Sequence, residues 1–176
     1  MNIEEILKRI ERTGGNINES LEDYMSTCLS LSEDEFDELN DSIGIDMFCL
    51  QYDITFITIK REGEINFVHY SNPNNEDSIK KIGLINMDSE WIMDLGQGTY
   101  VIAEDNYIAE DNLLTYLSEK DNVDELLKVT GVYNGPYEEC VYGVEHEGYI
   151  LILHDIKPED LDTEVVSCEE VFLKVC

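Results

Sequence analysis

The amino-acid sequence predicts an α+β fold, in which a helical N-terminal segment precedes a region of strands and short helices. Up to about residue 45, apolar residues recur at helical spacing. From Met47 onward, β-branched and aromatic residues gather in runs of strand length, and short helical patterns separate several of these runs. We therefore divide the chain into an N-terminal helical appendage, residues 1–45, and an α+β domain, residues 46–176.

Two helices are predicted in the appendage. The first covers residues 2–12, where four apolar residues share one face: Ile3, Ile6, Leu7 and Ile10. Two consecutive glycines, Gly14 and Gly15, end this pattern. The second helix covers residues 33–40, because Ser32 stands three residues before Glu35, which is the spacing of a capping box.

The α+β domain is predicted to begin with a hairpin and a short helix. Two apolar runs flank the charged stretch 61–64, which contains Gly63 and is predicted to be the hairpin turn. The second strand ends at His69. A loop then leads into a helix over residues 76–82, which Gly83 terminates.

Further elements are predicted after residue 90. They are a strand pair around residues 96–98, a helix over 106–120, a helix over 123–129, a turn at 134–136 and three strand-like runs at the end of the chain. The helix over 123–129 is predicted because Val123, Leu126 and Leu127 share one helical face.

The chain carries a large negative charge. Its 176 residues are 43% apolar, which suits one ordinary domain with a substantial core. Eleven Lys and Arg stand against forty Asp and Glu, so the formal net charge is −29 at pH 7. Such a field repels nucleic acid and anionic membranes and attracts basic protein surfaces. We therefore expect a basic protein partner, for example nucleic-acid-binding machinery, and no direct binding to nucleic acid or to membrane.

The expected location is cytoplasmic. No apolar stretch is long enough to span a membrane, and the charged N-terminus lacks a signal-peptide core. The five cysteines are odd in number and contain no Cys-x-x-Cys pair. We therefore expect reduced thiols, with neither a disulfide framework nor a metal site.

Three places in the sequence contain residues suited to chemistry, and each alone is a weak signal. His69 and Ser71 follow a strand-like run in "VHYS". The stretch "GQGTY", which ends at Tyr100, lacks the third glycine of a dinucleotide fingerprint and the lysine of a P-loop. Glu145 and Glu147 precede the apolar run "GYILIL". Taken separately, a structural histidine, a glycine turn and solvated acids would explain them.

Taken in order over residues 65–161, these motifs resemble the ADP-ribosyltransferase fold of the diphtheria-toxin and poly-ADP-ribose-polymerase type. The resemblance implies a split antiparallel β-sheet core with short helices, with NAD as the co-substrate. That family presents a His-Tyr-Glu triad on three strands of the sheet. The matching residues are His69, Tyr100 and Glu147, with Glu145 as the alternative carboxylate.

The resemblance also implies a role for each residue. Breaking the bond between nicotinamide and ribose develops an oxocarbenium-like cation, which a fixed carboxylate stabilises. Glu147 would hydrogen-bond the nicotinamide ribose, His69 would orient the other ribose, and Tyr100 would stack on the nicotinamide ring. The residues expected to complete the cofactor site are Tyr70, Ser71, Gly98 and Tyr107. The family usually has a small residue where Tyr70 stands, which implies a crowded nicotinamide pocket.

These observations lead to three hypotheses about function. The first is a mono-ADP-ribosyltransferase that modifies and inactivates a basic protein. It would act as a bacterial or phage effector, for example an anti-defence (anti-CRISPR-like) protein, in the host cytoplasm. The second is a non-catalytic inhibitor that mimics the phosphates of nucleic acid and occupies a cationic groove one to one. The third is an acidic adaptor or immunity protein that binds a toxin.

Overall fold

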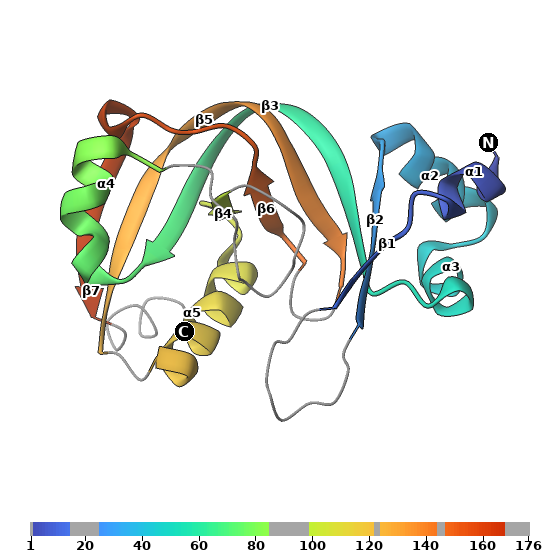
Figure 1. Ribbon diagram of the computed structural model, residues 1–176, viewed down its shortest axis with the longest axis horizontal. Helices are drawn as coiled ribbons and strands as arrows, with labels where there is room; N and C mark the ends of the chain where they lie inside the picture. The colour runs from blue at the N-terminus through green and yellow to red at the C-terminus, as the bar shows by residue number, and fades with distance from the viewer. Residues whose placement is uncertain (1, 15–24, 85–98, 122–123, 144–146, 168–176) are drawn as a thin grey trace.

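The computed structural model describes residues 2–14, 25–84, 99–121, 124–143 and 147–167 (Figure 1). The first elements are α1 (Ile3–Leu7), β1 (Glu11–Gly14), β2 (Met25–Leu31), α2 (Glu33–Ser42), α3 (Ile45–Tyr52) and β3 (Phe56–Ser71). After a 3₁₀ turn at Pro73–Asn75 come α4 (Glu76–Ile82), β4 (Thr99–Ala103), α5 (Tyr107–Asp121), β5 (Glu125–Tyr142) and β6 (Tyr149–Ile152). A second 3₁₀ turn, Pro158–Asp160, leads into β7 (Leu161–Ser167).

The strands form one sheet with the order β1-β2-β3-β4-β6-β5-β7. β2 and β3 run parallel, and the other neighbouring pairs are antiparallel. β3 also pairs directly with β5, so that β3, β4, β6 and β5 form a closed ring of pairings. Together with the short helices, this sheet confirms the predicted α+β class.

Helices cover the two faces of the sheet. On one face, Ala109 and Leu114 of α5 belong to the same buried cluster as Val68, Tyr70 and Ile102, which we call the α5-side core. On the other face, Ile79 of α4 belongs to a cluster with nine further buried residues, which we call the α4-side core: Phe67, Leu84, Val101, Leu127, Val129, Tyr133, Ile150, Ile152 and Ile156.

β3 and β5 are long strands where the sequence predicted shorter elements. Their pairing continues from Thr58 opposite Cys140 to Ser71 opposite Leu127. The predicted hairpin turn at 61–64, the predicted helix over 123–129 and the predicted turn at 134–136 are therefore wrong. Leu126 and Leu127 are both buried, but in the two different cores, so consecutive apolar residues on two faces resembled one helical face.

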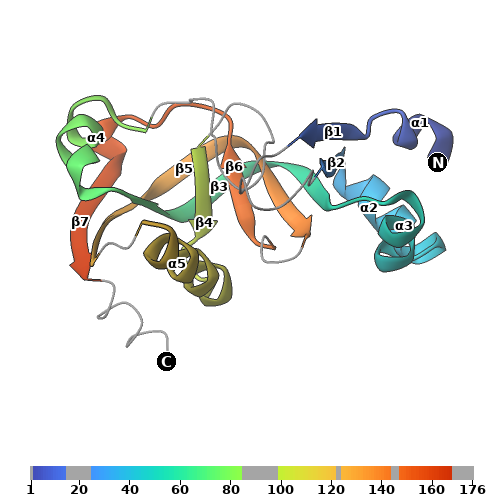
Figure 2. The ribbon, with the colours of Figure 1, turned by 60° about the horizontal axis from the view of Figure 1, so that its bottom comes forward.

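The predicted N-terminal helical appendage is not confirmed. β1 and β2 lie within this region and extend the sheet, with β2 parallel to β3. The segment that begins at Met47 was expected to be a strand, yet it lies in α3. α1, α2 and α3 lie at the opposite end of the molecule from α4 and β7 (Figures 1 and 2). They pack on a third cluster that contains Leu39, Phe48 and Ile57, so this core includes residues from both sides of position 45.

Three predicted helices are present with nearly the predicted bounds, whereas the helix predicted over residues 2–12 is present only as α1, and β1 begins at Glu11. α2 and α5 match the predicted helices over 33–40 and 106–120 to within one or two residues, and α4 matches 76–82. Gly83 ends α4 with a positive φ of 81°, which favours glycine. None of the helices in the described ranges is long and apolar enough to cross a bilayer.

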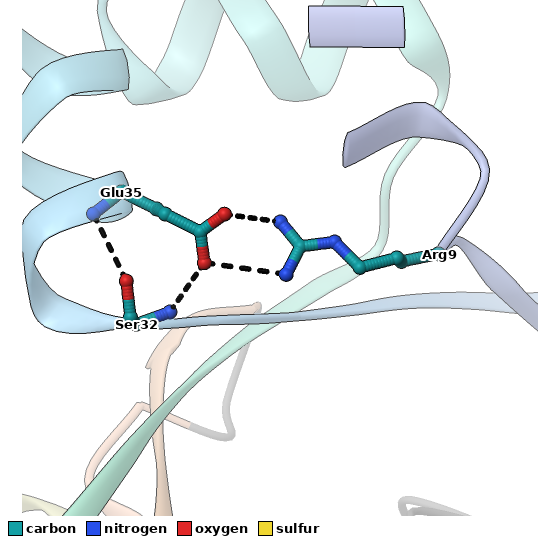
Figure 3. Close-up of polar contacts among 3 residues, drawn as sticks. All are labelled: Arg9, Ser32 and Glu35. Atoms are coloured by element: carbon teal, nitrogen blue, oxygen red, sulfur yellow. Dashed lines mark hydrogen bonds and ion pairs between the residues drawn. The ribbon is translucent and has the colours of Figure 1, made fainter. Parts of the chain in front are cut away.

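The capping box of α2 is formed, and an ion pair joins its Glu35 to Arg9, two residues after the end of α1 (Figure 3). The Glu35 backbone N–H donates to Ser32 Oγ at 3.2 Å, and the Ser32 backbone N–H donates to Glu35 Oε1 at 3.0 Å. The Arg9 guanidinium donates to both carboxylate oxygens of Glu35. The hydrogen bond from Arg9 is the main cause that lowers the pKa of Glu35 to about 2.

This pKa predicts an acid-sensitive contribution to stability. Because the folded pKa lies below the ordinary value of 4.5, the contribution is present above about pH 4.5 and is lost as the pH falls towards 2. Glu35→Gln keeps a capping-box residue and removes the charge. We expect it to lower the free energy of unfolding at pH 7 by about 1 kcal/mol, after discounting for solvent exposure.

Urea denaturation of wild type and Glu35→Gln at several pH values measures this difference. The two free energies should converge in acid. Ser32→Ala serves as a control, because it removes the hydroxyl cap at a cost of about 1 kcal/mol without removing the ion pair. A difference between wild type and Glu35→Gln that stays constant from pH 7 to acid would contradict the prediction.

Candidate active site

His69 lies near the end of β3 and contacts the next strand. Its Nδ1 is 2.7 Å from the carbonyl oxygen of Tyr100 on β4. A carbonyl oxygen only accepts, so Nδ1 carries the hydrogen and Nε2 keeps its lone pair in the neutral ring. Burial lowers the pKa of His69, and the hydrogen bond to Tyr100 opposes this shift. A neutral imidazole of this tautomer can accept a hydrogen bond from a ligand hydroxyl at Nε2.

The three residues of the predicted triad lie on neighbouring strands. His69 is on β3, Tyr100 is on β4, and Glu147 stands two residues before the first residue of β6. The sheet order places β3, β4 and β6 next to one another, with β4 in the centre. His69 and Tyr100 are thus brought to adjacent strands, and Glu147 to the turn before the next one.

The side chains of the triad do not converge in this structure. Along β4 and β6, Tyr100 is opposite Leu151, and Glu147 precedes Leu151 by four residues, or about 13 Å. Tyr100 packs against the α5-side core with Val68 and Tyr70, its neighbours on β3. His69 alternates with those two residues and therefore points to the α4 side of the sheet. The sheet thus separates the imidazole from the Tyr100 ring, and Glu147 is exposed at the far end of β6.

The expected cofactor residues have different environments. Ser71 directly follows Tyr70 on β3, and its Oγ accepts a hydrogen bond from Asn75 Nδ2 at 2.8 Å. Tyr107 is exposed at the start of α5. Gly98 lies outside the described residues, as do Glu145 and His146. Tyr70 is buried against α5, so its ring does not crowd the face of the sheet on which His69 lies.

Comparisons with protein-family models, curated proteins and solved structures found no match to this chain. The assignment of a function therefore rests on the chain's own residues. Within the described parts of the chain, no cluster of His, Cys, Asp or Glu has the arrangement of a metal site. Cys28, Cys49 and Cys140 are buried. Burial raises the pKa of Cys49 and of Cys140 to about 12, which does not suit a thiolate nucleophile.

A buried pair, Tyr70 and Glu110, joins β3 to α5 and was missed from the sequence. The Tyr70 hydroxyl donates to Glu110 Oε1, and the two residues are only 2% and 7% exposed. Burial, followed by the neighbouring Glu110 carboxylate, raises the pKa of Tyr70, so its phenol remains a donor. One signal was available: Glu110 stands three and four residues before Leu113 and Leu114, on the face of α5 that packs on the sheet.

Removing the phenol hydroxyl should destabilise the protein. In Tyr70→Phe the Glu110 carboxyl stays buried without its donor, and the expected loss is about 1–3 kcal/mol in the free energy of unfolding. The double variant Tyr70→Phe with Glu110→Leu should recover part of this loss, because it removes both polar groups. Urea denaturation of the two single variants and the double variant tests the coupling. Additive losses would show that the pair does not interact.

A second missed carboxylate, Glu138, lies beside the candidate site. Glu138 on β5 is opposite Leu151 on β6. On the other side of β6, Leu151 is opposite Tyr100 on β4. Glu138 shares a face with Cys140, a member of the α5-side core, so it lies on the same face as Tyr100. Two strand spacings separate these positions, or about 10 Å. The Ser30 hydroxyl donates to Glu138 Oε1 at 2.8 Å and fixes its orientation. No local pattern distinguishes Glu138 from the other Asp and Glu residues, which number forty in all.

Proposed function

We propose that this chain is a mono-ADP-ribosyltransferase that uses NAD to modify a basic protein. One observation carries the proposal: the strands that bear or adjoin His69, Tyr100 and Glu147 are three consecutive strands of the sheet. This is the arrangement that the resemblance implies for the triad. The hydrogen bond between the His69 imidazole and the Tyr100 backbone supports it further, since it fixes the imidazole beside β4.

The reaction assigns a task to each side chain. The bond between nicotinamide and the ribose C1 breaks, and nicotinamide leaves with the bonding electrons. An acceptor atom of the target protein bonds to C1 through its lone pair and releases its proton to water. The oxocarbenium-like charge on the ribose needs a nearby carboxylate, for which Glu147 is the first candidate and Glu138 the alternative. His69 orients a ribose hydroxyl through Nε2. Because the His69 and Tyr100 rings lie on opposite faces of the sheet, a dinucleotide bound on the Tyr100 face would use Glu138, and one bound on the other face would use His69.

The charge of the chain supports a basic target. At −29, the protein attracts a cationic surface over a distance of about a Debye length and speeds the encounter at low salt. An effector that acts in a host cytoplasm on nucleic-acid-binding machinery fits this preference, because such machinery presents basic surfaces. The anti-defence role belongs to the same proposal.

The test of the proposal is transfer of label from NAD. The purified protein is incubated with NAD labelled in its adenosine part and with a lysate of host cells, and proteins that acquire label are detected on a gel. A discrete labelled band, formed with a trace amount of the protein, supports the transferase. No band at any protein concentration would overturn it.

The second candidate is a stoichiometric inhibitor that mimics nucleic acid. It is favoured by the separation of the triad side chains and by the exposed carboxylates of α2, at Asp34, Asp37 and Asp41. A mimic acts one to one, needs no NAD and loses affinity steeply as salt rises. Titration of a captured basic partner with and without NAD separates the two functions.

A further inference from the structure

We infer that the outer face of α3, together with α2, is a docking surface for a basic amphipathic helix of a partner protein. This inference deepens the proposed function, since it states where the basic target binds. It concerns a part of the molecule at the opposite end from α4 and β7 (Figures 1 and 2).

The starting observation is an apolar pair on α3 that the described parts of the chain leave exposed. Met47 and Leu50 are 61% and 79% exposed, whereas Ile45, Phe48 and Cys49 of the same helix are buried and Tyr52 is partly buried. They stand three residues apart and so lie on one face of the helix. Ile45, Phe48 and Cys49 face the interior instead. A methionine is a flexible side chain that adapts to a partner's surface.

Exposed carboxylates lie on the same two helices, α2 and α3. Asp46 is exposed next to Met47 on α3, and four residues of α2 are exposed at helical spacing: Asp34, Asp37, Glu38 and Asp41. α2 and α3 pack on the same core cluster through Leu39 and Phe48, so their outer faces point to solvent at one end of the molecule. In the described parts of the chain, Arg9 forms an ion pair with Glu35, and Arg61 forms ion pairs with Glu33 and Glu139. These ion pairs do not involve Asp34, Asp37 or Asp41.

The negative charge of α2 and α3 determines which kind of partner can bind there. A second copy of this chain would bring the same carboxylates against themselves, and an anionic membrane would be repelled in the same way. A cationic partner with apolar side chains at helical spacing matches both features: its apolar residues cover Met47 and Leu50, and its Lys or Arg side chains reach the carboxylates of α2.

The experiment uses two synthetic peptides of leucine and lysine with identical composition. In one, the leucines recur at helical spacing and form an amphipathic helix, and in the other their order is scrambled. Both peptides carry the same charge, so their difference in affinity reports the apolar contact. Binding is measured by isothermal titration calorimetry with the full chain at several salt concentrations.

Four measurements decide the proposal. Wild type should bind the helical peptide about tenfold more tightly than the scrambled one. Met47→Ser with Leu50→Ser should abolish this preference. Tyr107→Ser with Ile108→Ser is the matched control, because that pair on α5 is equally exposed, at 66% and 78%, and should keep the preference. Asp34→Asn with Asp37→Asn and Asp41→Asn should weaken binding of both peptides and reduce the salt dependence.

Each contrary result overturns the docking surface. Equal affinity for the two peptides, or an equal effect of the two serine variants, would mean that only general electrostatic attraction is present. A wild type that self-associates in sedimentation, beside a monomeric Met47→Ser/Leu50→Ser variant, would show that a second copy covers this face. Glu147→Ala should leave peptide binding unchanged, so loss of the transferase proposal and loss of the docking surface are separate outcomes.

Discussion

Glu147→Ala is expected to reduce transfer of ADP-ribose from NAD by about 10²–10³-fold, the usual effect of removing one group that stabilises transition-state charge. The carboxylate is exposed, so its removal leaves no buried group unpaired and the fold should persist. The initial rate of label incorporation, measured beside the thermal melting curve of each variant, gives the loss of activity separately from any loss of structure.

Two variants show whether Glu147 is the right carboxylate. Glu138→Gln keeps an acceptor for the Ser30 hydroxyl and removes the charge that lies on the Tyr100 face of the sheet. Glu145→Ala tests the other acid before β6. If Glu138→Gln abolishes transfer while Glu147→Ala retains it, the charge acts from β5. If all three variants transfer label at the wild-type rate, a carboxylate-assisted mechanism at this site is excluded.

Local signals predicted the start of α2 and the end of α4. Ser32 and Glu35, which stand three residues apart, form the capping box at the start of α2, and Gly83 is the residue that ends α4. Such signals depend on hydrogen bonds between neighbours along the chain, which the sequence displays directly. The bounds of these helices could therefore be predicted without knowledge of the sheet.

The long strands could not be predicted in the same way. β5 is buried on both faces over part of its length, so the alternation expected of a half-exposed strand is absent at Leu126 and Leu127. The charged stretch around Gly63 has the composition of a turn, but in the structure it pairs with the stretch around Gly135. Pairing between distant segments decided both cases, and no local pattern contains that information.

The candidate site was predicted at the level of strands but not of faces. The resemblance placed the three residues on three strands of one sheet, and β3, β4 and β6 are neighbours in the observed sheet. Which face each side chain points to depends on register, because a shift of one residue moves a side chain to the other face of a sheet. The sequence therefore placed His69 and Tyr100 together, whereas the structure places the Tyr70 ring on the Tyr100 face and the His69 ring on the other.

Gly83→Ala is expected to lower the free energy of unfolding by about 3–5 kcal/mol, a large part of the stability of an ordinary domain. A Cβ at this position would lie 2.0 Å from the carbonyl oxygen of Ile156. That oxygen accepts from the Leu84 backbone N–H at 3.0 Å, and the Ile156 N–H donates back to Leu84 at 2.8 Å. Leu84 and Ile156 both belong to the α4-side core and form a β-bridge that anchors α4 to this core. Movement of the two residues apart, which would relieve the clash, would break this bridge.

Gly44→Ala is the matched control for this prediction. Gly44 has a similar positive φ, 88° against 81° at Gly83, but a Cβ there would meet nothing within 4 Å. Its expected loss of about 1–3 kcal/mol reports the backbone strain alone. Gly83→Ala should cost about 2 kcal/mol more in urea denaturation, because the clash with Ile156 adds to the same strain. Equal losses in the two variants would mean that the backbone at Ile156 moves aside freely, and that the bridge contributes little to holding α4 on the sheet.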